Sequence, residues 1–145
     1  TGAGVLTCVK VENDEDYKKY GIVDGVKESG GRVKLNAIIE KPGKKNAPSN
    51  LASVSGYIFT PKIFEYLHSD LESYDGTTEF ILQPSIQRMI DDGFTYYGLE
   101  VAGGKYYDTG NKLEYLKTVV DFALEDQELS ADFMAHLKQI VNNRQ

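Results

Sequence analysis

Hydrophobic and polar residues alternate along the chain with the periods of strands and helices. Two runs, residues 5–11 and 51–59, are apolar on both faces, as buried strands are. Residues 20–25 predict a short strand, and residues 94–101 predict another. The clearest alternation covers residues 32–40, which predicts a strand with one buried face. Because strands come first and then mix with helices, the pattern predicts a mixed α/β fold.

The alternation over residues 32–40 also predicts which side chains share a face. We expect an inner face of Val33, Leu35, Ala37 and Ile39, and an outer face of Arg32, Lys34, Asn36 and Glu40, with Ile38 as an interruption. The short turn at residues 29–31 predicts that this strand pairs antiparallel with residues 20–25.

Helical patterns follow in the second half of the chain. Thr60 and Pro61 predict a helix start, with the helix ending near His68, and Gln83-Pro84 predicts a second entry. Two further helices are expected at about residues 111–124 and from Ser130 onward, with Ser130 as the cap. The expected inward residues are Ile63, Phe64 and Leu67; Ile86, Met89 and Ile90; Leu113, Leu116, Val120 and Leu124; and Phe133, Leu137, Ile140 and Val141.

Composition excludes several classes of protein. The chain has 145 residues, enough for one domain with a core. Its formal charge of −6 disfavours a general nucleic-acid binder, which needs a basic face. A single cysteine, Cys8, forms no internal disulfide, and the two histidines suggest no zinc site. No apolar run approaches the roughly 20 residues that span a bilayer. We therefore expect a cytoplasmic protein with no nucleic-acid or membrane partner, and Cys8 as a small core residue.

The chain begins with Thr1 and enters an apolar strand almost at once. This pattern differs from that of a polar tag or linker. We expect the chain to be a piece of a longer protein.

Glu40 and Lys41 end the alternating strand just before a loop that contains Pro42 and Gly43. A carboxylate accepts hydrogen bonds from sugar hydroxyls, and a lysine ammonium binds phosphate. The pair therefore indicates a sugar or phosphate site at the end of a strand. The alternative is a solvated charge pair, because exposed charges are common on any surface.

Two other places in the chain contain residues that are weaker signals of a functional site. Asp108, followed by Thr109 and Gly110, lies between a strand and a helix, where it can bind a metal, cap the helix or form a turn. Gly21 after Tyr20 can let a ligand approach the backbone, or it can be an ordinary turn. From the residues alone these alternatives stay open.

Five motifs occur in a fixed order along the chain. They cover residues 20–24, 39–42, 48–52, 57–64 and 107–117. Together they resemble the C-terminal half of the bacterial UTP–glucose-1-phosphate uridylyltransferases, also called UDP-glucose pyrophosphorylases. The resemblance covers nearly the whole chain. It implies a nucleotide-diphospho-sugar transferase fold, with a mixed sheet and flanking helices, of which residues 1–145 form the sugar-phosphate-binding portion.

The resemblance also implies a reaction. In this family the phosphate of glucose 1-phosphate attacks the α-phosphorus of UTP, which gives UDP-glucose and pyrophosphate with the help of Mg²⁺. The nucleotide loop and the main metal ligand of the family lie in the N-terminal half. We therefore expect that Mg²⁺ is held mainly by that half, that the chain needs its own N-terminal half for activity, and that the full-length protein is a homo-oligomer.

The resemblance assigns roles to particular residues. Glu40 corresponds to the acceptor of the glucose hydroxyls, and Lys41 to the catalytic contact to the sugar phosphate. Tyr20 and Gly21 correspond to backbone that faces the sugar. Asp108 matches an acidic position near the metal, and Lys112 is expected to face the phosphates.

The sequence departs from the family at two places. Ser55, Gly56 and Tyr57 stand where the family has Gly-Arg-Tyr. Pro84 stands where it has an aspartate, although Glu79 is kept. Two alternatives therefore remain: a related nucleotidyltransferase that uses another base or sugar, or a non-catalytic module for assembly or regulation.

Overall fold

The computed structural model describes residues 2–103 and 105–144, apart from the side chain of Ser55. The chain divides into two compact units, Thr1–Gly103 and Gly104–Gln145. Each unit is described by itself. Thr1 and the departure at the Ser55 side chain lie outside the described residues.

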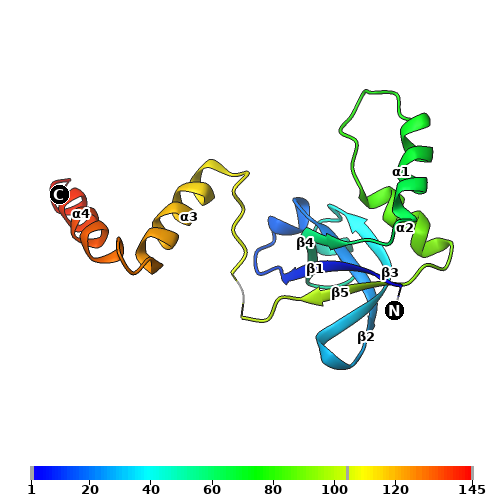
Figure 1. The fold of residues 1–145 in the computed structure, drawn as a ribbon, viewed down its shortest axis with the longest axis horizontal. Helices are drawn as coiled ribbons and strands as arrows, with labels where there is room; N and C mark the ends of the chain where they lie inside the picture. The colour runs from blue at the N-terminus through cyan, green and yellow to red at the C-terminus, as the bar shows by residue number, and fades with distance from the viewer. Residues whose placement is uncertain (1, 104, 145) are drawn as a thin grey trace. The chain divides into compact units, whose positions relative to one another are not determined.

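The first unit is built on a closed sheet of mixed direction (Figure 1). Its strands are β1 (Gly4–Lys10), β2 (Gly21–Lys27), β3 (Arg32–Glu40), β4 (Leu51–Ile58) and β5 (Tyr96–Glu100), and they close in the order β1-β4-β2-β3-β5. β1 and β5 are parallel, and the other neighbouring pairs are antiparallel. The predicted mixed sheet, and the antiparallel pairing of β2 with β3, are confirmed.

Two helices, α1 (Ile63–Glu72) and α2 (Gln83–Asp91), accompany this sheet on one side (Figure 1). Short 3₁₀ turns at Asp16–Lys18, Ser29–Gly31 and Lys44–Asn46 occupy the connections. α2 begins where Gln83-Pro84 predicted. α1 begins later than predicted, because a turn in which Ile63 N–H donates to the Thr60 carbonyl precedes it. It also continues past His68, to Glu72. The predicted threonine cap is not observed.

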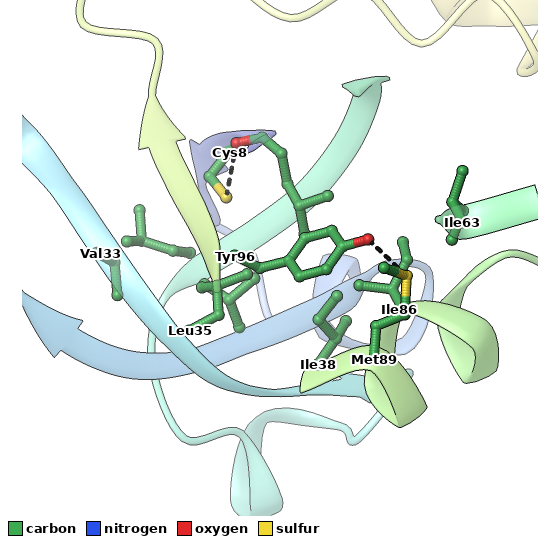
Figure 2. Close-up of a cluster of buried hydrophobic side chains, with 11 residues drawn as sticks. Cys8, Val33, Leu35, Ile38, Ile63, Ile86, Met89 and Tyr96 are labelled. Carbon is green, nitrogen blue, oxygen red and sulfur yellow. Dashed lines mark hydrogen bonds between the residues drawn. The ribbon is translucent and has the colours of Figure 1, made fainter. Parts of the chain in front are cut away.

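The core of the first unit lies between the sheet and these helices (Figure 2). Ile86 and Met89 of α2 are buried as predicted, and the Tyr96 hydroxyl donates a hydrogen bond to the Met89 sulfur at 3.1 Å. Ile63 is buried, but Phe64 is 70% exposed, so its predicted inward position is wrong. Successive helical residues differ by about 100°, and α1 turns Ile63 and the partly buried Leu67 to the core instead.

β3 contains an irregularity that corrects the predicted faces. Asp24 pairs with Ala37, but the next residue, Gly25, pairs with Leu35, so Asn36 is an extra residue in β3. A bulge of this kind shifts the alternation by one position. As a result Ile38 is buried and Ile39 is exposed, the reverse of the prediction.

The second unit contains α3 (Lys112–Glu125) and α4 (Ser130–Asn142). Both helices occur where the sequence predicted them, although the Ser130 side chain makes no cap hydrogen bond. Several residues expected to face inward are exposed: Leu113, Leu116, Ile140 and Val141. Val120, Leu124, Phe133 and Leu137 are half-buried. A helix pair buries only the stripe where the helices meet, which is narrower than the apolar pattern suggested. No helix within residues 2–103 or 105–144 has the length and apolarity to cross a membrane.

Candidate functional site

Four of the predicted site residues meet at the end of the β2–β3 ladder. Gly21 is the direct partner of Glu40 in the antiparallel register. One residue further along, the Lys41 N–H donates to the Tyr20 carbonyl at 3.2 Å. The structure therefore brings Tyr20, Gly21, Glu40 and Lys41 together, although they are about 20 positions apart in the sequence. Their roles toward a ligand stay predictions.

The bulge in β3 sets the direction of the Glu40 side chain. Residues two apart in a strand share a face, so Glu40 lies on the same face as buried Ile38. The alternation without a bulge had placed Glu40 with Arg32 and Lys34 on the outer face. The shift therefore brings the carboxylate to the rim of the core face, beside β2.

Gly21 leaves room for the Glu40 carboxylate. A Cβ atom at position 21 would lie 3.1 Å from Glu40 Oε2 and 3.1 Å from Ile38 Cγ2. These separations are shorter than ordinary van der Waals contact. A side chain at position 21 would thus push the carboxylate away from the backbone of β2. With glycine at position 21, neither the Glu40 carboxylate nor the Ile38 methyl group has to shift.

Lys41 has an unusual backbone conformation. Its φ is 47°, the one positive value for a residue other than glycine in the described ranges. The left-handed region is also disfavoured for a residue that precedes a proline, as Lys41 precedes Pro42. Two hydrogen bonds hold the strained turn: Lys41 N–H to the Tyr20 carbonyl, and Gly43 N–H to the Tyr17 carbonyl at 3.0 Å. Strain that is held in this way is typical of functional positions.

The two charged groups lie close to each other and remain accessible. Lys41 Nζ is 3.4 Å from Glu40 Oε1, and the side chains are 58% and 33% exposed, respectively. An exposed ion pair of this kind adds little to stability. Its geometry presents a hydrogen-bond acceptor and a cation side by side. This combination suits a ligand that carries both hydroxyl groups and a phosphate.

Sequence reasoning missed one residue at this place. The Cγ atom of Gln83, at the start of α2, would lie 4.0 Å from a Cβ atom at position 21. Its amide offers both donors and an acceptor. The Gln83-Pro84 helix entry was recognised as a structural signal, but nothing in it indicated that the helix begins beside β2. Pro84 itself occupies the first turn of α2, where a proline fits.

Asp108 and Lys112 belong to the second unit. The Asp108 carboxylate accepts a hydrogen bond from the Gly110 N–H at 3.1 Å, which favours the turn alternative. Asn111, and not Asp108, caps α3, because its side chain accepts from the Leu113 and Glu114 N–H groups. The cap alternative for Asp108 is therefore wrong, and Asn111 was missed although asparagine is a favoured cap residue. Lys112 is exposed at the first position of α3.

The described residues do not form a complete magnesium centre. No group of three His, Cys, Asp or Glu residues gathers within residues 2–103 and 105–144. A carboxylate site for Mg²⁺ uses one or two carboxylates together with substrate phosphates and water. Asp108 does not belong to such a group within the described residues.

Cys8 is a core residue and not a nucleophile. It is fully buried in β1, and its thiol is free. Burial raises the pKa of the Cys8 thiol to about 11, because the thiolate loses its solvation. The thiol is therefore uncharged at neutral pH and is chemically inert there.

Comparison with known proteins finds relatives that are named as enzymes. The UTP–glucose-1-phosphate uridylyltransferase of Staphylococcus epidermidis is 37% identical over 141 residues, which are 97% of this chain and 47% of the relative. Among solved structures, UDP-glucose pyrophosphorylase from Acinetobacter baumannii is similar with a TM-score of 0.77 and 30% identity, over 95% of this chain and 46% of that one. A structure of the A. baumannii enzyme with UTP bound matches with a TM-score of 0.76 and 31% identity, over 93% and 45% of the two chains.

The chain thus spans about half the length of the relatives that it matches. The model of the nucleotidyl transferase family matches residues 1–125, which include the whole first unit and all of α3. The structural similarity to UDP-glucose pyrophosphorylase and the sequence identity to the S. epidermidis relative agree with this match. The chain belongs to the nucleotidyl transferase family.

Proposed function

We propose that the chain is the sugar-phosphate-binding portion of a UTP–glucose-1-phosphate uridylyltransferase. The observation that carries the proposal is the arrangement at the end of the β2–β3 ladder. There the side chains of Glu40 and Lys41 lie side by side, and the Glu40 carboxylate is next to the buried Gly21. The name of the S. epidermidis relative and the UTP bound to the A. baumannii structure support the same reaction.

In the proposed reaction an oxygen of the phosphate of glucose 1-phosphate attacks the α-phosphorus of UTP. A new phosphorus–oxygen bond forms, and the bond from the α-phosphorus to pyrophosphate breaks, so UDP-glucose and pyrophosphate result. No covalent intermediate with the enzyme is needed. Glu40 accepts hydrogen bonds from glucose hydroxyls, and Lys41 neutralises the attacking phosphate. The chain thus contributes by positioning one of two mutually repelling anions.

We further propose that the chain corresponds to the C-terminal half of the relatives and that the other half supplies the nucleotide site. The order of the five motifs, from residues 20–24 to 107–117, supports this assignment. The purified 145-residue chain is then expected to form no UDP-glucose from UTP and glucose 1-phosphate. Detectable turnover by the chain alone would contradict this half-site proposal.

The remaining expectations depend on the same assignment. Mg²⁺ is proposed to be held mainly by the other half, with Asp108 as one acidic group near it, and Lys112 to face the phosphates. The full-length protein is proposed to be a homo-oligomer. A cytoplasmic location is also proposed, and the buried, free thiol of Cys8 is consistent with a reducing compartment.

The role of Lys41 can be tested in the full-length protein. Replacing a charged phosphate contact costs about 1.5–3 kcal/mol, so Lys41→Ala should lower kcat/KM for glucose 1-phosphate about 10- to 100-fold. Lys45→Ala, which removes an exposed lysine from the same loop, is the matched control and should leave kcat/KM unchanged. Equal values for Lys41→Ala and the parent enzyme would remove Lys41 from the site.

Two second candidates have specific support. Pro84, in place of the family's aspartate, motivates a nucleotidyltransferase with another base or sugar, and turnover of UTP, dTTP and CTP measured side by side tests it.

The exposed apolar residues of α3 and α4, among them Leu116 and Val141, motivate a non-catalytic assembly module. Light scattering of the full-length protein beside an activity assay distinguishes assembly with turnover from assembly without it.

A further inference from the structure

Part of one edge of β3 is covered by a side chain instead of a neighbouring strand. β5 pairs with β3 only over Arg32–Lys34, so the following residues of β3 have no strand on that side. The side chain of Gln87, from α2, occupies this edge. Its Oε1 accepts a hydrogen bond from the Ile38 N–H at 2.9 Å, and its Nε2 lies 3.4 Å from the Asn36 carbonyl oxygen. One side-chain amide thus supplies the acceptor and the donor that a neighbouring strand would supply.

These two bonds span the bulge. Asn36 is the extra residue of β3, and Ile38 is the first buried residue after the alternation has shifted. A flat strand in this position would return Glu40 to the outer face, because a shift of one residue reverses every side chain. The contacts of Gln87 therefore hold the part of β3 that determines where Glu40 points.

A third contact orients the amide of Gln87. Its Nε2 donates to Asp91 Oδ1 at 2.8 Å, and Asp91 lies one helical turn further along α2. An ionised carboxylate only accepts hydrogen bonds, so the NH₂ group must point toward Asp91. The carbonyl oxygen is then left to face the Ile38 N–H. The direction of the amide follows from the chemistry of its partners.

We propose that Gln87 is a positioning residue for the sugar-phosphate site: it fixes the bulge in β3 and, through it, the carboxylate of Glu40 beside Gly21. Gln87 contacts no substrate in this account. Its effect passes along two residues of β3, from Ile38 to Glu40, and one further to the strained backbone of Lys41. The inference rests on the function proposed above, because the affected ligand is the sugar phosphate.

The test compares Gln87→Met with the parent in the full-length protein. Methionine keeps the length and the helix propensity of the side chain but removes the strong donor and acceptor. We expect the KM for glucose 1-phosphate to rise about five- to tenfold, the factor for the loss of about one net hydrogen bond, while the KM for UTP stays the same. Gln139→Met, at an exposed position of α4, is the matched control and should change neither KM.

Amide hydrogen exchange of the same variants separates this inference from the proposed reaction. Gln87→Met should speed the exchange of the Ile38 N–H and also of the Lys41 N–H, which bonds to Tyr20 rather than to Gln87. Faster exchange at both positions supports the positioning role, whether or not the parent enzyme makes UDP-glucose. A parent enzyme that makes no UDP-glucose would overturn the proposed function, but not the positioning role. Unchanged exchange of the Lys41 N–H would overturn the positioning role. A lower kcat with both KM values unchanged would overturn it as well.

A second variant covers the case in which Gln87→Met does not fold. Gln87→Glu keeps an acceptor for the Ile38 N–H but loses the donor toward Asn36 and places a carboxylate beside Asp91. It should also raise the KM for glucose 1-phosphate and speed exchange at Lys41. Parent values for both quantities in this variant would contradict the proposal.

Discussion

The two units of the chain hold their residues in different ways. In the first unit, a continuous core includes fully buried side chains from the sheet and from α1 and α2, such as Leu6, Ile63 and Tyr96. In the second unit, Thr118 is the buried residue of α3, and the described residues of α4 include none. Its helices contain local interactions, such as the Asn111 cap and the exposed Lys117–Glu114 ion pair at 2.7 Å.

This difference explains where a precise site can be built. A strained backbone such as that of Lys41 persists only when its surroundings determine it, and the packed sheet of the first unit provides such surroundings. An exposed helix pair has no comparable means of fixing a side chain. We therefore expect the first unit to dominate the stability of the chain and the placement of Glu40 and Lys41.

The largest expected effect comes from the same substitution, leucine to alanine, made once in each unit. Leu6 is fully buried in β1, whereas Leu116 is 61% exposed on α3. Leu6→Ala should lower the free energy of unfolding by about 3–5 kcal/mol, because it leaves a cavity in a packed core. Leu116→Ala should lower it by less than about 1 kcal/mol. Urea denaturation of both variants measures the difference, and similar losses would contradict the contrast between the units.

The buried thiol of Cys8 gives a pH-dependent test of the first unit. The thiol ionises near 9.0 in the unfolded chain, and burial raises its pKa to about 11 in the folded chain. Between these values the unfolded state releases the proton and the folded state keeps it. Stability is therefore lost as the pH rises from about 9 to about 11, by about 2–3 kcal/mol from this group.

Cys8→Ala is the reference for this effect, because it removes the titrating group and leaves the other ionisable residues in place. The free energy of unfolding of the variant should fall less steeply than that of the parent between pH 9 and pH 11. Parallel curves for the two proteins would show that Cys8 is solvated in the folded state, and the account of the core would fail.

The smallest expected loss of stability comes from removing the cap of α3, in the second unit. Asn111→Ala removes the acceptor for the Leu113 and Glu114 N–H groups, and such losses cost about 1 kcal/mol of helix stability. Circular dichroism should show fraying of helix in the variant, while the cooperative transition of the first unit keeps its midpoint. A shift of the main transition by more than a few degrees would show that the two units unfold together.

The sequence allowed the strands, most helices and the place of Glu40 and Lys41 at the end of a strand to be predicted, because these depend on local patterns. Residues 32–40 alternate so clearly that the bounds of β3 were predicted correctly. The loop with Pro42 and Gly43 marked the end of that strand. The short turn at residues 29–31 fixed the pairing with β2, and this pairing brings Gly21 opposite Glu40.

The features that escaped prediction depend on contacts between distant parts of the chain. The bulge at Asn36 involves Gly25 on the partner strand and Gln87 on α2, and neither is visible in the alternation of β3 itself. It reversed the predicted positions of Ile38 and Ile39. In the second unit, the apolar pattern correctly located the helices, but periodicity alone does not say how much of a stripe such as that of Leu113 and Leu116 becomes buried.

The central claim is that Glu40 and Lys41 bind the sugar phosphate beside Gly21. A crystal structure of the full-length protein with UDP-glucose tests it most directly. We predict a carboxylate oxygen of Glu40 within hydrogen-bond distance of glucose hydroxyls, and Lys41 Nζ next to a phosphate oxygen. Glucose bound away from the end of the β2–β3 ladder, with the Glu40–Lys41 ion pair facing solvent alone, would contradict the claim.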